Sequence, residues 1–115
     1  MSKLAKYLIF DLQEDWSKPS IKFFRSSGAY GYILWLTVVD NFYSEQNMTI
    51  DELVTKLEKY ASRRTILDFI YRGVDAEFLK KEVFSKDKRK ILIKPTDITI
   101  KEYAHWSEYF VKSVT

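Results

Sequence analysis

The sequence contains no cysteine and only one histidine, His105. It therefore has no disulfide framework, no thiolate metal ligand and no cysteine nucleophile, and a single imidazole cannot form a histidine cluster around a metal ion. Two prolines and three glycines in 115 residues are too few for a disordered or linker-rich chain. We expect a packed protein that carries neither a metal nor a cofactor.

Long apolar runs are missing as well. No segment approaches the roughly 18 apolar residues that a membrane span requires. The N-terminal segment MSKLAKYLIFDLQEDW places acidic residues within a few positions of its apolar stretch, unlike the core of a secretory signal. The sequence therefore predicts a cytoplasmic protein with no membrane partner.

The charge is unevenly distributed along the chain, although the net charge is only +3. Residues 56–94 hold 12 Lys or Arg and 6 Asp or Glu, whereas the rest of the chain holds 7 basic and 10 acidic residues. A neutral or acidic body with one basic segment is typical of a nucleic-acid-binding protein with a separate scaffold or dimerisation part. The alternative is ordinary solvated surface charge.

The length suits a single domain, because a domain of this size buries over ~60% of its unfolded surface. Residues 1–47 are expected to form scaffold and dimerisation helices. Apolar residues at helical spacing predict helices over 3–16, with the stripe Leu4, Leu8, Leu12 and Trp16, and over 19–28. Residues 29–47 are apolar almost all round, which indicates a central element. Their β-branched residues would also suit a strand, but the length favours a helix.

A helix-turn-helix is predicted over residues 48–77. Thr49 and Glu52 have the spacing of a capping box, so a helix should begin there and run to about Leu57. After a short turn, Ser62 can cap a second helix that turns Ile66, Phe69 and Ile70 inward. Two short helices joined in this way are typical of a DNA-binding helix-turn-helix.

From Phe78 the apolar period changes to two, which predicts a β-hairpin over residues 78–95 with a charged tip at Lys86 to Lys90. Ile91 and Ile93, or Leu92 alone, would pin the second strand to the core. A last helix is predicted over 96–115, with Thr99 and Glu102 as its capping box and Thr96 as an alternative start. The predicted fold is mainly α with a small β-hairpin (α+β), namely a winged helix-turn-helix with N- and C-terminal helices for dimerisation.

The segment of about residues 49 to 99 resembles the DNA-binding core of the MarR family of transcriptional regulators. In that family a Ser-Arg-x-Thr-Val start opens the recognition helix, matched here by residues 62–66, and the wing reads Asp-x-Arg, matched by residues 87–89. The resemblance implies that Asp87 braces Arg89 and that Arg89 enters the minor groove. The family usually has glycine where Glu77 stands.

The resemblance also implies partners. Members are generally homodimers built from their terminal helices, and Trp106 and Tyr109 could belong either to such an interface or to the core of one subunit. An effector pocket is typical between the dimer helices and the DNA-binding lobe, so a small molecule is a possible partner. Its candidate lining is Tyr30, Tyr32, Trp35 and Trp16.

The sequence thus predicts a sequence-specific regulator that binds double-stranded DNA, most simply a repressor acting by occlusion. The alternative keeps the fold but makes it a protein-interaction or replication-assembly module. We expect no enzyme, because no paired histidine and nucleophile or phosphate-binding glycine loop is present. Asp68 could accept a hydrogen bond from cytosine or pair with an arginine, and Tyr71 and Arg72 could reach DNA or pack under the wing. The candidate DNA-binding residues are Ser62, Arg63, Arg64, Thr65, Asp68, Tyr71, Arg72, Lys86, Asp87, Lys88, Arg89 and Lys90.

Overall fold

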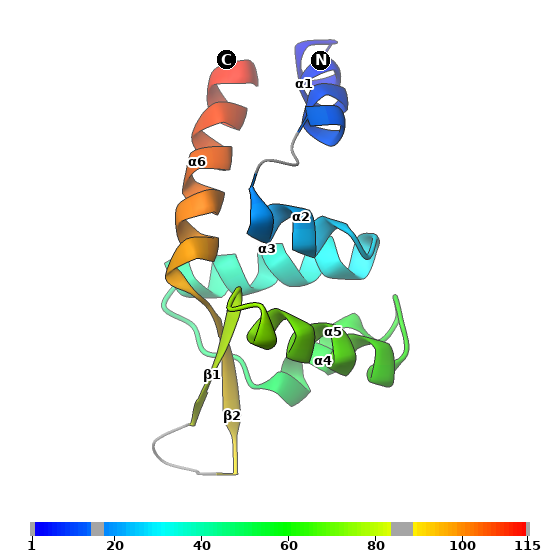
Figure 1. Cartoon of the computed structure of the whole chain (residues 1–115), viewed down its shortest axis with the longest axis vertical. Coiled ribbons are helices and arrows are strands. Elements are labelled where there is room, and N and C mark those ends of the chain that lie inside the picture. Colours follow the sequence, from blue (N-terminus) through cyan, green and yellow to red (C-terminus); the bar gives the residue numbers. More distant parts are fainter. Residues whose placement is uncertain (1, 15–17, 84–88, 115) are drawn as a thin grey trace.

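The chain folds into helices and one antiparallel hairpin arranged along an elongated body of 48 × 27 × 24 Å. The computed structural model describes residues 2–14, 18–83 and 89–114. The order along the chain confirms the predicted winged helix-turn-helix (Figure 1). The described elements are α1 (Ser2–Glu14), α2 (Pro19–Arg25), α3 (Ala29–Tyr43), α4 (Ile50–Leu57), α5 (Arg63–Asp75), β1 (Leu79–Val83), β2 (Ile91–Pro95) and α6 (Asp97–Val114).

Helix α3 is the central element, as its apolar composition predicts. It is a helix rather than a strand, and it ends at Tyr43, earlier than the predicted boundary at residue 47. Leu34, Trp35 and Val38 are buried within it, and it packs against α2, α4 and β2. At Gly31 a Cβ atom would stand 2.4 Å from the Phe24 carbonyl oxygen, so the absence of a side chain lets α2 cross α3 closely.

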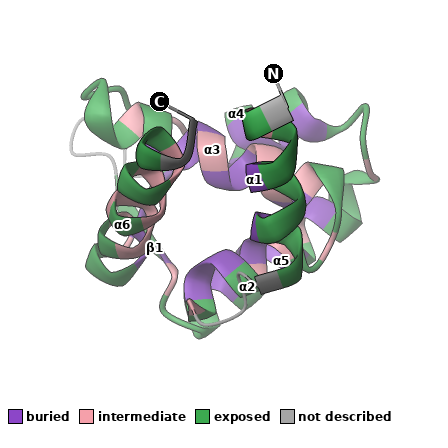
Figure 2. Cartoon of the chain, turned by 90° about the horizontal axis from the view of Figure 1, so that it is seen from above, coloured by how far each residue is buried: buried purple, intermediate pink, exposed green. Residues whose placement is uncertain are grey.

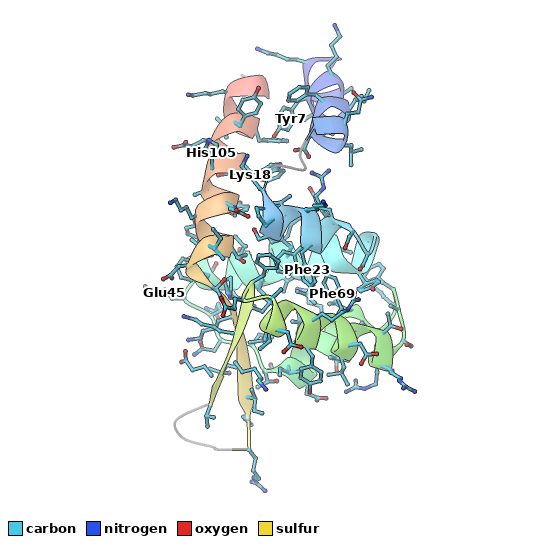
Figure 3. All side chains as sticks on the ribbon, in the orientation of Figure 1. Tyr7, Lys18, Phe23, Glu45, Phe69 and His105 are labelled. Carbon is cyan, nitrogen blue, oxygen red and sulfur yellow. The ribbon has the colours of Figure 1, made fainter. Side chains whose placement is uncertain are left out.

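An aromatic stack joins the helix-turn-helix to the rest of the body. The ring of Phe23 in α2 lies 4.6 Å from that of Phe69 in α5, with 6° between the planes (Figure 3). Buried residues concentrate on α2, α3 and the inner side of α5, whereas α1 and α6 expose much of their surface (Figure 2). Helix α5 therefore rests on a rigid packed base.

The hairpin has the predicted position but not the predicted alternation. Leu79 pairs with Pro95, and Val83 pairs with Ile91. Leu92 and Ile93 are both buried, while Ile91 is 38% exposed. Of the two predicted alternatives, the structure therefore supports Leu92 as the anchor of the wing, joined by Ile93, and the expectation for Ile91 is wrong. The reason is that β2 is covered on both faces: it packs against α3 and α4, and its Ile93 N–H donates to the Met48 carbonyl at 3.1 Å.

Helix α1 begins at Ser2 and its predicted packing face is wrong. The buried side chains are Tyr7 and Asp11, whereas Leu8 and Leu12 of the predicted stripe are 41% and 61% exposed. Trp16 of that stripe lies outside the described residues. Tyr7 packs edge-on against Phe110 of α6, with ring centroids 4.9 Å apart. Much of the apolar surface of α1 is therefore left uncovered by its own chain.

Helix α6 begins at Asp97, so the predicted Thr99–Glu102 capping box is wrong and the alternative start after Thr96 is nearer to the structure. The Thr99 hydroxyl instead donates to the Phe78 carbonyl at 2.7 Å. Glu102 accepts hydrogen bonds from the Ser20 N–H at 2.8 Å and the Ser20 hydroxyl at 2.5 Å. Both side chains thus join α6 to other elements. Among the described helices, none has the length and apolar character to cross a membrane.

Candidate nucleic-acid interface

Both helices of the helix-turn-helix begin at the predicted caps. The Glu52 N–H donates to the Thr49 hydroxyl and the Thr49 N–H donates to the Glu52 carboxylate, each at 3.1 Å, which confirms the capping box. In α5 the Ser62 hydroxyl accepts from the Thr65 N–H at 3.1 Å and donates to the Thr65 hydroxyl at 2.9 Å. Ser62 and Thr65 therefore fix where the recognition helix starts.

The recognition helix ends in a left-handed residue. Glu77 has a φ of 65°, and the Phe78 N–H donates to the Gly73 carbonyl at 2.9 Å while the Glu77 N–H donates to the Val74 carbonyl at 3.0 Å. This is the hydrogen-bond pattern of a Schellman motif, in which glycine is preferred at the left-handed position. Glutamate thus occupies the left-handed position at which the resemblance leads us to expect glycine.

The outward side of α5 carries the predicted polar residues. Arg64 and Asp68 are exposed, and so are Tyr71 and Arg72, whereas Ile66, Phe69 and Ile70 are buried. The Arg72 guanidinium lies 5.5 Å from the centre of the Phe69 ring, and the Lys81 ammonium lies 5.8 Å from that of Tyr71. Tyr71 therefore links the recognition helix to β1 while remaining 46% exposed.

A groove of about 490 Å³ runs between the start of α4, the side of α5 and the tip end of β2. Arg63 and Arg89 both line it, so the first residue of α5 and the tip end of the hairpin face a common space. Tyr71 and Lys90 contribute to the same lining, together with Thr49, Ile50, Asp51, Glu52, Leu67 and Ile91. The groove joins parts of the chain that are up to 42 residues apart in sequence, from Thr49 to Ile91.

Arg63 makes two ion pairs that the sequence does not predict. Its Nη2 donates to Asp51 at 2.7 Å and its Nη1 donates to Glu58 at 3.2 Å. These hydrogen bonds raise the pKa of the Arg63 guanidinium above its usual value, Asp51 contributing most. In the sequence, Asp51 appears only as an acidic residue in the first turn of a helix. It reaches Arg63 because α4 and α5 cross in the folded chain.

The tip of the wing lies partly outside the described residues, and the predicted site residues Lys86, Asp87 and Lys88 belong to that part. Arg89 and Lys90 are described, and both are exposed at the start of β2. The hairpin extends away from the body at the end opposite to the chain termini (Figure 1).

A second cavity, of about 410 Å³, is bounded by α1, α2 and the start of α3. Of the four aromatic residues expected around an effector, only Tyr32 lines it. Trp35 is fully buried in the core, Tyr30 packs edge-on against Phe69 at 5.4 Å, and Trp16 lies outside the described residues. The lining is Leu8, Asp11, Leu12, Arg25, Gly28, Ala29 and Tyr32.

No protein-family model and no curated protein sequence matches the chain. Solved structures of similar fold do match. The heme sensor protein PefR from Streptococcus agalactiae, in complex with heme, has a TM-score of 0.57 and 14% identity over 96% of this chain and 73% of that chain. The transcriptional regulator PA4135 has a TM-score of 0.55 and 13% identity, and the match covers 96% of this chain and 76% of that chain.

A ZitR variant from Lactococcus lactis in apo form has a TM-score of 0.51 and 18% identity, covering 98% of this chain and 76% of that chain. The chain spans about half the length, 53%, of another ZitR variant that it matches. These similarities extend over almost all of this chain and confirm the predicted fold.

Proposed function

We propose that the chain is a cytoplasmic transcriptional regulator that binds double-stranded DNA sequence-specifically, as a MarR-like repressor. The observation that carries this proposal is the shared groove: Arg63 of the recognition helix and Arg89 of the wing line one surface. A duplex can meet both only if they face the same side, because a recognition helix in the major groove places the wing on the adjacent backbone or minor groove.

The predicted residues divide into base-reading and backbone-binding groups. Arg63, Arg64 and Thr65 stand in the first turn of α5, where the helix dipole also favours phosphate. Asp68, Tyr71 and Arg72 lie further along the outward side and would follow the groove floor. The wing residues Lys86, Lys88, Arg89 and Lys90 would bind the backbone and minor groove, with Asp87 bracing Arg89, and Ser62 would support the helix start.

The regulator would act as a homodimer through α1 and α6. Ile9 and Phe10 of α1 are 57% and 46% exposed, and Tyr109 and Val111 of α6 are 53% and 55% exposed. Helix α1 and the C-terminal part of α6 lie at the end of the body opposite to the wing (Figure 1). An apolar surface shared by the two terminal helices fits a second copy of the chain, and the resulting twofold axis would present two recognition helices to a palindromic site.

A small-molecule effector is the natural regulator of such a dimer. The cavity between α1, α2 and α3 adjoins the exposed apolar residues of α1, since Leu8 and Leu12 line it. A ligand there would contact both the dimerisation helix and α3, which supports the DNA-binding lobe. Its chemistry would combine apolar contact with the polar groups of Asp11 and Arg25.

Selection of bound duplexes from a random pool tests the proposal. The wild type should enrich a short, roughly palindromic, AT-containing site, because paired half-sites mirror a protein dyad. The variant Arg89→Ala should bind that site substantially more weakly. Recovery of no enriched sequence at low salt would contradict sequence-specific binding.

A protein-interaction or assembly module is the second candidate. The observation that favours it is the presence of Asp51 and Glu52 in the groove beside Arg63, which makes this surface less basic than the sequence predicts. Salt separates the two functions. Binding of a generic duplex should weaken with a log–log slope of about −0.9 per neutralised phosphate, whereas a flat response would favour the interaction module.

A further inference from the structure

The guanidinium of Arg63 is held by carboxylates from the two ends of α4. Asp51 stands in the first turn of α4, and Glu58 is its C-cap residue. Their carboxylates accept from different terminal nitrogens of Arg63, at 2.7 and 3.2 Å. We call Asp51, Glu58 and Arg63 the carboxylate clasp. It occupies the entrance to the recognition helix, where the first contacts with a duplex would form.

The sequence predicts a positive local charge at the start of α5, but with the clasp the local charge there is negative. One guanidinium faces two carboxylates, so the three groups together carry a net charge of −1. A DNA phosphate that approaches Arg63 must meet both carboxylates at close range, and their repulsion opposes the attraction of the arginine. The edge of a base has no net charge and is not repelled in this way.

The geometry still leaves donors for a base. Each terminal nitrogen of a guanidinium carries two N–H groups, and the ion pairs with Glu58 and Asp51 occupy one on each nitrogen. Guanine presents two acceptors, N7 and O6, in the major groove, and a bidentate arginine is the commonest specific contact to them. The two carboxylates fix the guanidinium through one N–H on each terminal nitrogen, and its remaining N–H groups are the donors that can make such a contact.

We propose that Asp51 and Glu58 are specificity-determining positioning residues, which keep Arg63 from binding phosphate and hold it for a base edge, preferentially that of guanine. The inference rests on the proposed function, since it concerns how a duplex is read. It assigns to two acidic residues outside the recognition helix the task of lowering non-specific affinity.

The clasp is open to solvent, so its carboxylates can be changed without disturbing the core. The side chain of Asp51 is 80% exposed, that of Glu58 is 47% exposed and that of Arg63 is 49% exposed. Neither carboxylate belongs to the capping box of α4, which is made by Thr49 and Glu52. The variants Asp51→Asn and Glu58→Gln should therefore fold like the wild type, as circular dichroism and thermal melting would show.

The experiment compares the wild type, both single variants and the double variant on two duplexes of equal length, the selected site and a scrambled sequence. The double variant should bind the scrambled duplex more tightly, with a log–log salt slope steeper by about 0.9 if Arg63 gains one phosphate. That slope corresponds to a Kd that changes about 3.5-fold more between roughly 50 and 200 mM salt. The ratio of scrambled to selected Kd should fall.

Two further variants make the test specific. Glu45→Gln removes the same charge from an exposed residue on the opposite side of the molecule from the start of α5 (Figure 3), and it should leave slope and ratio unchanged. Adding Arg63→Ala to the double variant should abolish the gain on scrambled DNA, because the gain acts through that side chain.

The outcomes separate the two proposals. Suppose that the wild type selects a site but the clasp variants have the same salt slope and the same ratio of scrambled to selected Kd as the wild type. The proposed role of Asp51 and Glu58 is then wrong, while the proposal of a DNA-binding regulator is unaffected. The same holds if Glu45→Gln reproduces the effect, since net charge alone would then explain it. If the wild type binds no duplex in a salt-dependent way, the regulator and the clasp are both overturned.

Discussion

At the scale of single residues, Glu77 has a left-handed backbone conformation that glycine adopts more easily. It lies in the turn between α5 and β1. Its φ of 65° lies in the left-handed region, which costs an L-residue about 1–2 kcal/mol and glycine almost nothing. We expect Glu77→Gly to raise the free energy of unfolding by about 0.5–1 kcal/mol, after allowing for the greater freedom of glycine in the unfolded chain. Urea denaturation monitored by circular dichroism measures the change.

The matched control is Glu77→Ala, which removes the same carboxylate but keeps a Cβ atom. It should change the free energy of unfolding by no more than about 0.5 kcal/mol, as is usual for an exposed substitution. An equal gain for both variants would mean that the charge of Glu77, and not its backbone, is the source of the effect.

A sequence pattern predicts local structure well only where its residues find their hydrogen-bond partners close by in the sequence. The same Thr-x-x-Glu spacing occurs at Thr49–Glu52 and Thr99–Glu102, and only the first forms a capping box. At the second, the Thr99 hydroxyl donates to the Phe78 carbonyl, and the Ser20 hydroxyl donates to the Glu102 carboxylate. These partners lie 21 and 82 residues away, so no short window of sequence contains them.

The candidate site also contains residues that a local pattern predicts and contacts that no local pattern predicts. Ser62, Arg63 and Arg89 are predictable, because a capping pattern and a family motif mark them along the chain. The ion pairs of Arg63 with Asp51 and Glu58 depend on how α4 crosses α5, which apolar periodicity does not specify. The apolar pattern of α1 likewise does not specify its packing, since periodicity identifies a helix but does not identify the molecule that covers its exposed apolar side.

At the scale of elements, Asp11 joins α1 to two other helices. Its Oδ2 accepts from the Arg25 guanidinium of α2 at 2.7 Å, and its Oδ1 accepts from the Trp106 indole N–H of α6 at 2.9 Å. The side chains of Asp11 and Arg25 are only 5% and 10% exposed. A buried ion pair of this kind specifies an arrangement more than it adds stability, but breaking one side of it is costly.

We expect Asp11→Asn to lower the free energy of unfolding by about 1.5–3 kcal/mol, because it replaces the charged acceptor of a buried hydrogen bond from Arg25 by a neutral one. The amide oxygen can still accept from Trp106, so the loss should report the ion pair itself. Urea denaturation measures it. Asp40→Asn, an exposed change on α3, should cost less than about 0.5 kcal/mol, and Asp11→Asn combined with Arg25→Met should recover part of the loss.

A small loss in Asp11→Asn, similar to that of Asp40→Asn, would contradict this account. It would mean that α1 is attached mainly through Tyr7 and its ring contacts with Tyr109 and Phe110. The two sets of contacts join α1 to different parts of the molecule. Asp11 contacts α2 and α6 and lines the cavity beside α2. The ring contacts of Tyr7 join α1 to α6.

At the scale of the whole molecule, the wing lies at one end of a 48 Å body, and α1 and the C-terminal part of α6 lie at the other. Dimerisation through α1 and α6 would therefore leave both DNA-binding surfaces open. Linking two binding units makes the second contact intramolecular and raises the overall affinity by about 10²–10⁴-fold when the geometry allows both to bind. The proposed dimer thus predicts that interface variants affect DNA binding without touching the DNA.

We expect Ile9→Glu to convert the dimer to a monomer, because it places a charge on an apolar surface that a second copy would bury. Light scattering after size exclusion measures the mass. Affinity for the palindromic site should fall by about 10²-fold or more, while affinity for a single half-site stays unchanged. Gln13→Glu, an equal charge change at another exposed position of α1, should preserve the dimer. A dimeric Ile9→Glu, or a wild type that is monomeric and binds the palindrome no more tightly than a half-site, would exclude α1 as the element that pairs the two recognition helices.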